Sequence, residues 1–73
     1  MKAVKGKGGL MSFIMKDEAA LFNNIVFNNG LPVNSLDERE SHLLDEMFKR
    51  NVLRKVKRNG LPYYMTYPQE NVL

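Results

Sequence analysis

Basic residues are concentrated between positions 49 and 58, and they are the side chains of this sequence best suited to binding chemistry. Six of these ten residues are Lys or Arg and none is acidic. Such a stretch favours polyanions, because each cation that neutralises a phosphate releases condensed counterions. Alternatively, lysines of this kind protect an exposed strand edge from aggregation. The candidate phosphate contacts are Lys49, Arg50, Arg54, Lys55, Lys57 and Arg58.

Residues suited to catalysis or metal binding are sparse by comparison. The sequence contains no Cys and a single His, His42, which lies four residues after Glu38 and four before Glu46. On a helix this spacing could form a weak chelate, but it is more typical of surface ion pairing. We therefore expect a protein that is not an enzyme and that needs no cofactor or metal.

Length and apolar content predict one small domain. The 73 residues are 44% hydrophobic, and a chain of this size buries only about 60% of the surface that its unfolded form exposes. Without disulfides, dimerisation or a bound partner is the expected source of further stability. The longest apolar stretch, Leu10–Met15, is too short to cross a bilayer. Together with the lack of Cys, it indicates a cytoplasmic protein with no membrane segment.

The net charge of +3 divides into blocks along the chain. Residues 1–16 carry +4, residues 17–46 carry −6 and residues 47–73 carry +5. The first nine residues combine three Lys with three Gly, which predicts a flexible basic arm. The domain itself is expected over residues 10–67, followed by a loose tail over residues 68–73.

The first expected helix lies in the acidic block, over about residues 17–29. Its apolar residues have helical spacing, Asp17 is the expected N-cap, and Asn29-Gly30 is a typical helix end. The preceding residues 10–15 are compatible with a strand or with the lead-in to this helix.

The second expected helix covers about residues 35–50. Ser35 and Glu38 have the spacing of a capping box, in which each residue satisfies a free backbone N–H group. Asn51 is expected to adopt the left-handed conformation that ends the helix, and Val52 to fold back onto it.

Residues 52–67 alternate between apolar and polar side chains, which indicates a β-hairpin. Asn59-Gly60 is typical of the centre of a type I′ turn, and a two-residue loop pairs Arg58 with Leu61. In this register Pro62 falls at a non-hydrogen-bonded position, so its missing N–H costs no ladder bond. The face expected to join the core carries Val52, Val56, Tyr63, Met65 and Tyr67, and the opposite, basic face carries Leu53, Lys55, Lys57, Tyr64 and Thr66.

Residues 31–67 resemble the recognition helix and wing of winged helix-turn-helix DNA-binding domains. The resemblance is carried by the capped helix and by the run from Asn51-Val52-Leu53-Arg54-Lys55 through Asn59-Gly60 to Tyr67. It implies that Leu31-Pro32-Val33 is the short strand that this family places before its helix-turn-helix. Residues 35–50 would then lie in the major groove, and residues 55–60 would contact the adjacent backbone. The implied fold is α+β, a small winged-helix-like domain with two main helices followed by a C-terminal hairpin.

The function implied by this resemblance is duplex DNA binding. The small size of the chain suggests a compact transcriptional regulator of viral, phage or plasmid type, and the small core without disulfides suggests a homodimer. The implied groove-facing residues of the helix are Arg39, Ser41, His42 and Glu46, and Tyr64 is expected beside the cations of the hairpin. Two alternatives remain open. The acidic helix face would also suit a winged-helix module that binds a protein partner. A pairing strand at residues 10–15 would suit a ribbon-helix-helix dimer, although that minimal fold has no C-terminal hairpin.

Overall fold

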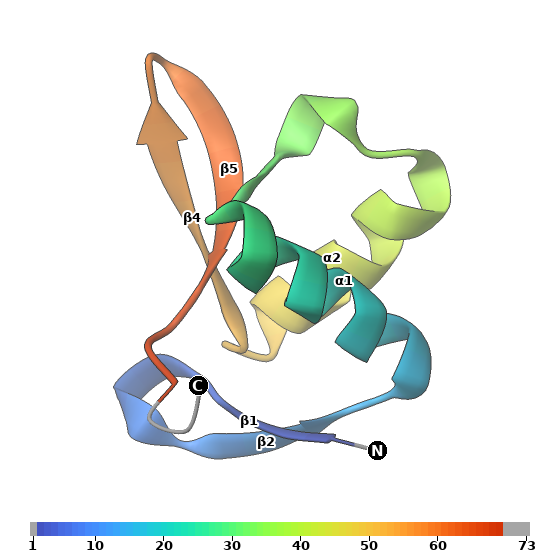
Figure 1. Cartoon of the computed structure of the whole chain (residues 1–73), viewed down its shortest axis with the longest axis vertical. Helices are drawn as coiled ribbons and strands as arrows, with labels where there is room; N and C mark the ends of the chain where they lie inside the picture. The colour runs from blue at the N-terminus through green and yellow to red at the C-terminus, as the bar shows by residue number, and fades with distance from the viewer. Residues whose placement is uncertain (1, 70–73) are drawn as a thin grey trace.

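The computed structural model describes residues 2–69, which form an α+β fold of two helices and five strands. Figure 1 shows one hairpin at the foot of the molecule and the tip of a second hairpin at the top. Strands β1 and β2 form an antiparallel two-stranded sheet, and the other three strands form a sheet in the order β3-β5-β4. The elements are β1 Lys2–Lys5, β2 Met11–Ile14, α1 Lys16–Asn28, β3 Leu31–Pro32, α2 Glu38–Lys49, β4 Leu53–Arg58 and β5 Leu61–Thr66, with 3₁₀ turns at Lys7–Gly9 and Val33–Ser35.

The order of elements differs from the expected two helices followed by a hairpin. The unexpected element is the hairpin that precedes α1, whereas the short strand β3 lies between the helices where the resemblance places one, over Leu31–Pro32. Residues 2–9, which composition predicts to be a flexible arm, form β1 and the turn that leads into β2. Val4 is buried against the helices, and a Cβ added to Gly6 would overlap the Asn51 carbonyl oxygen. This glycine therefore permits a close approach to the end of α2.

Helix α1 has the expected extent, but its N-cap is one that the sequence did not indicate. The helix begins at Lys16, and Met15 rather than Asp17 occupies the N-cap position. The Met15 N–H donates to a carboxylate oxygen of Glu18 at 2.8 Å, which satisfies a backbone group that the helix leaves free. At the other end, the helix stops at the predicted Asn29-Gly30, and Asn29 is the residue in the left-handed conformation, with φ of 56°.

Helix α2 begins later than predicted, because a second capping box replaces the one expected at Ser35. The side chain of Asp37 accepts from the Glu40 N–H, and the Glu40 side chain accepts from the Asp37 N–H. Ser35 instead belongs to the 3₁₀ turn. The C-terminal end matches the prediction: Asn51 has φ of 65°, and the Val52 N–H donates to the Met47 carbonyl.

The hairpin β4–β5 has the predicted register, but the assignment of its faces was wrong. Arg58 pairs with Leu61, and both turn residues, Asn59 and Gly60, have positive φ. Tyr64, expected on the exposed basic face, is instead buried in the core together with Leu53. The reason is that α2 packs on this face of the hairpin, with its Phe48 ring edge-on to Tyr64 at 6.5 Å.

Both helices and both sheets contribute to one hydrophobic core. Neither of the two described helices is long and apolar enough to cross a membrane. At the C-terminal end, Gln69 hydrogen-bonds to the backbone of Lys5, and the remainder of the predicted loose tail lies outside the described residues. The buried core residues are Val4, Ile14, Leu21, Phe22, Ile25, Leu44, Met47, Val52, Leu53 and Tyr64.

Candidate nucleic-acid interface

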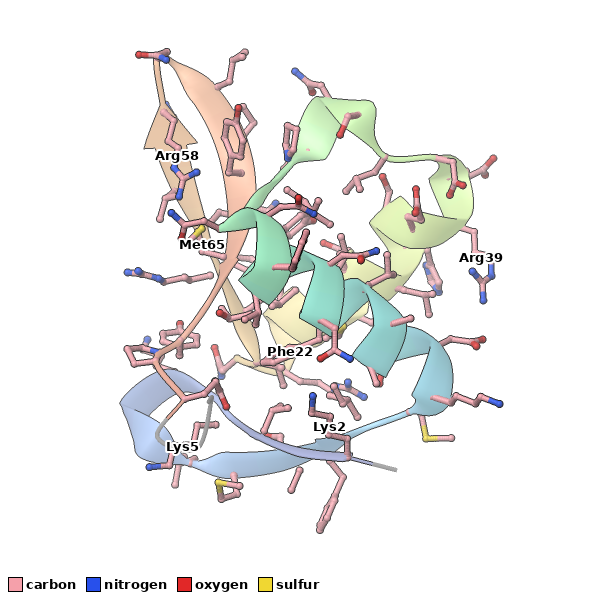
Figure 2. All side chains as sticks on the ribbon, viewed as in Figure 1. Lys2, Lys5, Phe22, Arg39, Arg58 and Met65 are labelled. Carbon is pink, nitrogen blue, oxygen red and sulfur yellow. The ribbon has the colours of Figure 1, made fainter. Side chains whose placement is uncertain are left out.

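Four of the predicted phosphate contacts lie together on β4, an edge strand of the three-stranded sheet. Because side chains alternate along a strand, Lys55 and Lys57 lie on one face of the hairpin, and Arg54 and Arg58 lie on the other. Positive charge therefore surrounds the strand on both faces. Figure 2 shows Arg58 on the hairpin, at the edge of the molecule.

Lys55 is held over two aromatic rings. Its Nζ lies 4.8 Å from the centre of the Phe48 ring and 5.3 Å from that of Tyr64. The negative face of an aromatic ring attracts an ammonium group without neutralising its charge. The rings therefore order the lysine side chain and leave its charge available to an anion.

Arg58 is positioned by its own strand pair. Its guanidinium carbon lies 5.2 Å from the centre of the Tyr63 ring, and its Nη2 donates to the Met65 sulfur at 3.2 Å. Gly30, beside the end of α1, makes room for this arrangement, because a Cβ there would come within 2.8 Å of the Met65 sulfur and 3.3 Å of Arg58 Nη1. The guanidinium group is thus partly ordered without a carboxylate partner.

Three other predicted contacts are ion-paired with carboxylates of the helices. Figure 2 places Arg39 on the side of the molecule opposite Arg58. Asp45 also raises the pKa of the Lys49 ammonium through a hydrogen bond and its negative charge. In this respect these three cations differ from the four of the hairpin, which have no carboxylate partner within residues 2–69. The pairs are Arg39 with Asp17 (2.8 Å), Arg50 with Glu18 (2.8 Å) and Lys49 with Asp45 (3.2 Å).

The remaining predicted site residues do not join the hairpin cations at the surface. Tyr64 is only 3% exposed, with its ring edge-on to Phe48 at 6.5 Å, so it offers no platform for a nucleic-acid base. Burial, with a smaller contribution from the charge of Asp45, raises the pKa of its hydroxyl. His42 is exposed on α2, and Ser41 beside it is half-buried.

The residues that position Arg58 were missed by sequence reasoning. Tyr63 and Met65 were assigned to the core, although the predicted register already placed them on the same face as Arg58. In an antiparallel pair, a long side chain reaches its diagonal neighbour on that face, so the Arg58–Tyr63 contact follows from the register. No sequence pattern predicts the contribution of Gly30, because it depends on how α1 packs against the sheet.

Residues 2–69 contain no group of three or more His, Asp or Glu side chains placed to hold a metal ion. Comparisons with protein-family models, with curated proteins and with solved structures find no match to this chain. The functional argument therefore rests on the charges and geometry of the chain itself.

Proposed function

We propose that this chain binds duplex DNA through the cations of hairpin β4–β5. One observation carries the proposal: Arg39, Lys49 and Arg50 are paired with carboxylates, whereas Arg54, Lys55, Lys57 and Arg58 lie together on one strand and are not paired with any carboxylate among residues 2–69. Phosphates would supply the missing negative charge, and aromatic rings already order two of the four side chains. Contacts of this kind give affinity for the backbone and do not read sequence.

The arrangement of elements around the hairpin supports a winged-helix-like mode of binding. Strand β3 precedes α2, the hairpin follows it, and β3 pairs with β5. Where the family normally has a further helix, this chain has only the 3₁₀ turn Val33–Ser35. The proposal therefore assigns the principal contact to the wing rather than to α2. The small size of the chain suits a compact regulator of viral, phage or plasmid type.

The charge of α2 also favours the hairpin as the principal contact. Glu38 and Glu46 are exposed on this helix and have no ion pair among the described residues, so they would repel phosphates in a groove. Arg39, which could offset them, is already paired with Asp17.

Fluorescence anisotropy with a labelled duplex of about 20 base pairs tests the proposal, because phosphate contacts make affinity depend on salt. Four contacts predict that the association constant falls about 100-fold between 50 and 200 mM salt. Arg54→Glu with Lys57→Glu should weaken binding at least about ten-fold, since two contacts are lost and two repulsions are introduced. Lys16→Glu, at an exposed lysine at the start of α1, is the matched control and should change affinity little. No binding at 50 mM salt would refute the proposal.

The acidic face of α2 supports a second candidate function, the binding of a protein partner. Asp37 and Glu40 are used in the helix cap and Asp45 is paired with Lys49, so Glu38 and Glu46 are the carboxylates left for such a partner. Under this alternative, Glu46→Lys abolishes capture of the partner, and charge reversal in the hairpin leaves it intact. If charge reversal in the hairpin abolishes DNA binding and Glu46→Lys leaves it intact, the hairpin is favoured instead.

A further inference from the structure

The outward side chains of strand β2 are apolar and exposed, and β1 contributes Ala3 and Lys5 to the same face. Strand β2 alternates between side chains that face the core, such as Ile14, and side chains that face solvent. The outward residues Met11 and Phe13 are 59% and 68% exposed, and Met15, the next residue of this alternation, is 60% exposed. Large apolar side chains grouped on one exposed face are typical of an interaction surface.

The outer backbone edges of the two strands of this hairpin differ in whether other groups hydrogen-bond to them. The outer edge of β1 is covered by Gln69, whose side-chain amide accepts from the Lys5 N–H and donates to the Lys5 carbonyl, both at 2.8 Å. The outer edge of β2 has no such cover, and no strand within residues 2–69 pairs with it.

The backbone groups at the open edge can be identified from the register. Lys5 lies opposite Met11, and its N–H and carbonyl are turned outward to Gln69, so these two residues form a non-hydrogen-bonded pair. By the alternation of an antiparallel ladder, the N–H and carbonyl groups of Met11 and Phe13 point away from β1. They form a short row of donors and acceptors ready to pair with another strand.

The side chains of this strand do nothing to prevent such pairing. Residues 10–15 contain no charged residue and no Pro, the two devices that commonly protect a free edge. The contrast with β4 is direct, because that edge strand carries four cations.

We propose that β2 pairs with β2 of a second copy of this chain. An antiparallel arrangement with Ser12 on the two-fold axis lets Met11 and Phe13 of one copy exchange backbone hydrogen bonds with Phe13 and Met11 of the other. Each Phe13 ring then lies beside a methionine sulfur on the outer face, a favourable contact.

The resulting four-stranded sheet leaves both β4–β5 tips free, since each tip lies at the end of the molecule away from β2 (Figure 1). Dimerisation does not depend on DNA binding, so either proposal can be correct if the other fails.

Sedimentation equilibrium of the full chain tests the proposal. We expect a reversible monomer–dimer equilibrium, weak because paired edge strands bury less than a standard interface. Phe13→Lys should raise the dissociation constant at least about ten-fold, since lysine on an edge strand opposes pairing. Phe27→Lys is the matched control: Phe27 is 88% exposed on α1, outside this face, and the substitution should leave the equilibrium unchanged.

Amide hydrogen exchange of the unmodified chain provides a test that no substitution can confound. The N–H groups of Met11 and Phe13 should exchange more slowly as the protein concentration rises through the dimer range. A chain that stays monomeric at millimolar concentration would overturn the proposal. A dimer that tolerates Phe13→Lys, or one that leaves both amides in fast exchange, would also overturn it.

Discussion

Hairpins β1–β2 and β4–β5 are both anchored in the shared core, through Ile14 in one and Leu53 in the other, yet their outward faces differ in charge. The first presents Met11 and Phe13 to solvent, and the second presents Lys57 and its neighbouring cations. An uncharged edge can accept another strand, whereas a cationic edge repels a copy of itself and attracts polyanions. The comparison indicates that outward side chains, more than backbone architecture, separate the roles of these two hairpins.

The turns of the two hairpins differ in how they are held. Asn59 and Gly60 close β4–β5 by local preference alone, because both tolerate positive φ. The turn of β1–β2 also contains two glycines with positive φ, Gly8 and Gly9, but it is tied to the end of α2 by a tertiary contact, in which the Lys7 N–H donates to the Asn51 carbonyl at 2.9 Å. The first hairpin therefore depends more on the rest of the fold than the second.

The largest expected effect comes from removing the anchor of the N-terminal hairpin. Ile14→Ala should lower the free energy of unfolding by about 2–5 kcal/mol, because it empties a fully buried site. Chemical denaturation measures this value, and Leu53→Ala in the other hairpin should cost a similar amount. If residues 2–14 were a mobile arm, Ile14→Ala would leave stability nearly unchanged while Leu53→Ala would not.

Gly6→Ala probes the contact between the first turn and the end of α2. Gly6 has φ of −110°, which alanine adopts readily, so any cost is steric. The added Cβ would overlap the Asn51 carbonyl oxygen, and we expect a loss of about 1–3 kcal/mol. Unchanged thermal and chemical stability would show that this turn does not rest on α2.

Gly60→Ala gives the complementary test in the second turn. A Cβ at Gly60 meets no atom within 4 Å, but φ there is +81°, so the cost is conformational. We expect a loss of about 1–2 kcal/mol. A loss well above the Gly6→Ala value would contradict the view that the first turn is the one fixed by tertiary contact.

Sequence patterns predicted the elements that local chemistry determines. The type I′ turn, the register of β4–β5, the extent of α1 and the left-handed Asn51 all follow from short-range preferences. Two features did not follow. Strand β1 is formed by residues whose composition suggests mobility, and the burial of Tyr64 depends on α2, whose Phe48 packs against its ring. Both depend on contacts between segments that are distant in sequence.

The same limit applies to the candidate site. Counting charges identified the six cations of the basic stretch, and Arg39 was added from the helix. Sequence alone did not separate the four cations on β4 from the three with carboxylate partners. Asp17 and Glu18 lie more than twenty residues before the arginines that they neutralise. Such pairs become visible only when the two helices are placed together.

Tyr64→Phe is expected to have the smallest effect, confined to alkaline pH. Burial raises the pKa of Tyr64 above its ordinary value of 10.0, so the unfolded chain loses this proton at lower pH than the folded chain. The contribution of the neutral Tyr64 hydroxyl to the free energy of unfolding is therefore fully present below pH 10. It declines as the pH rises toward the raised pKa of the folded state. Denaturation at several pH values should show a shallower decline in the variant. Equal slopes in both proteins would contradict the burial of this hydroxyl.

The central claim, that hairpin β4–β5 is the surface that meets DNA, is tested most directly by an NMR titration of the full chain with a non-specific duplex. The account predicts that the amide resonances of residues 53–61 shift progressively, while those of β1–β2 and of the acidic face of α2 move little. Shifts concentrated around Glu38 and Glu46, or no shifts at 50 mM salt, would contradict it.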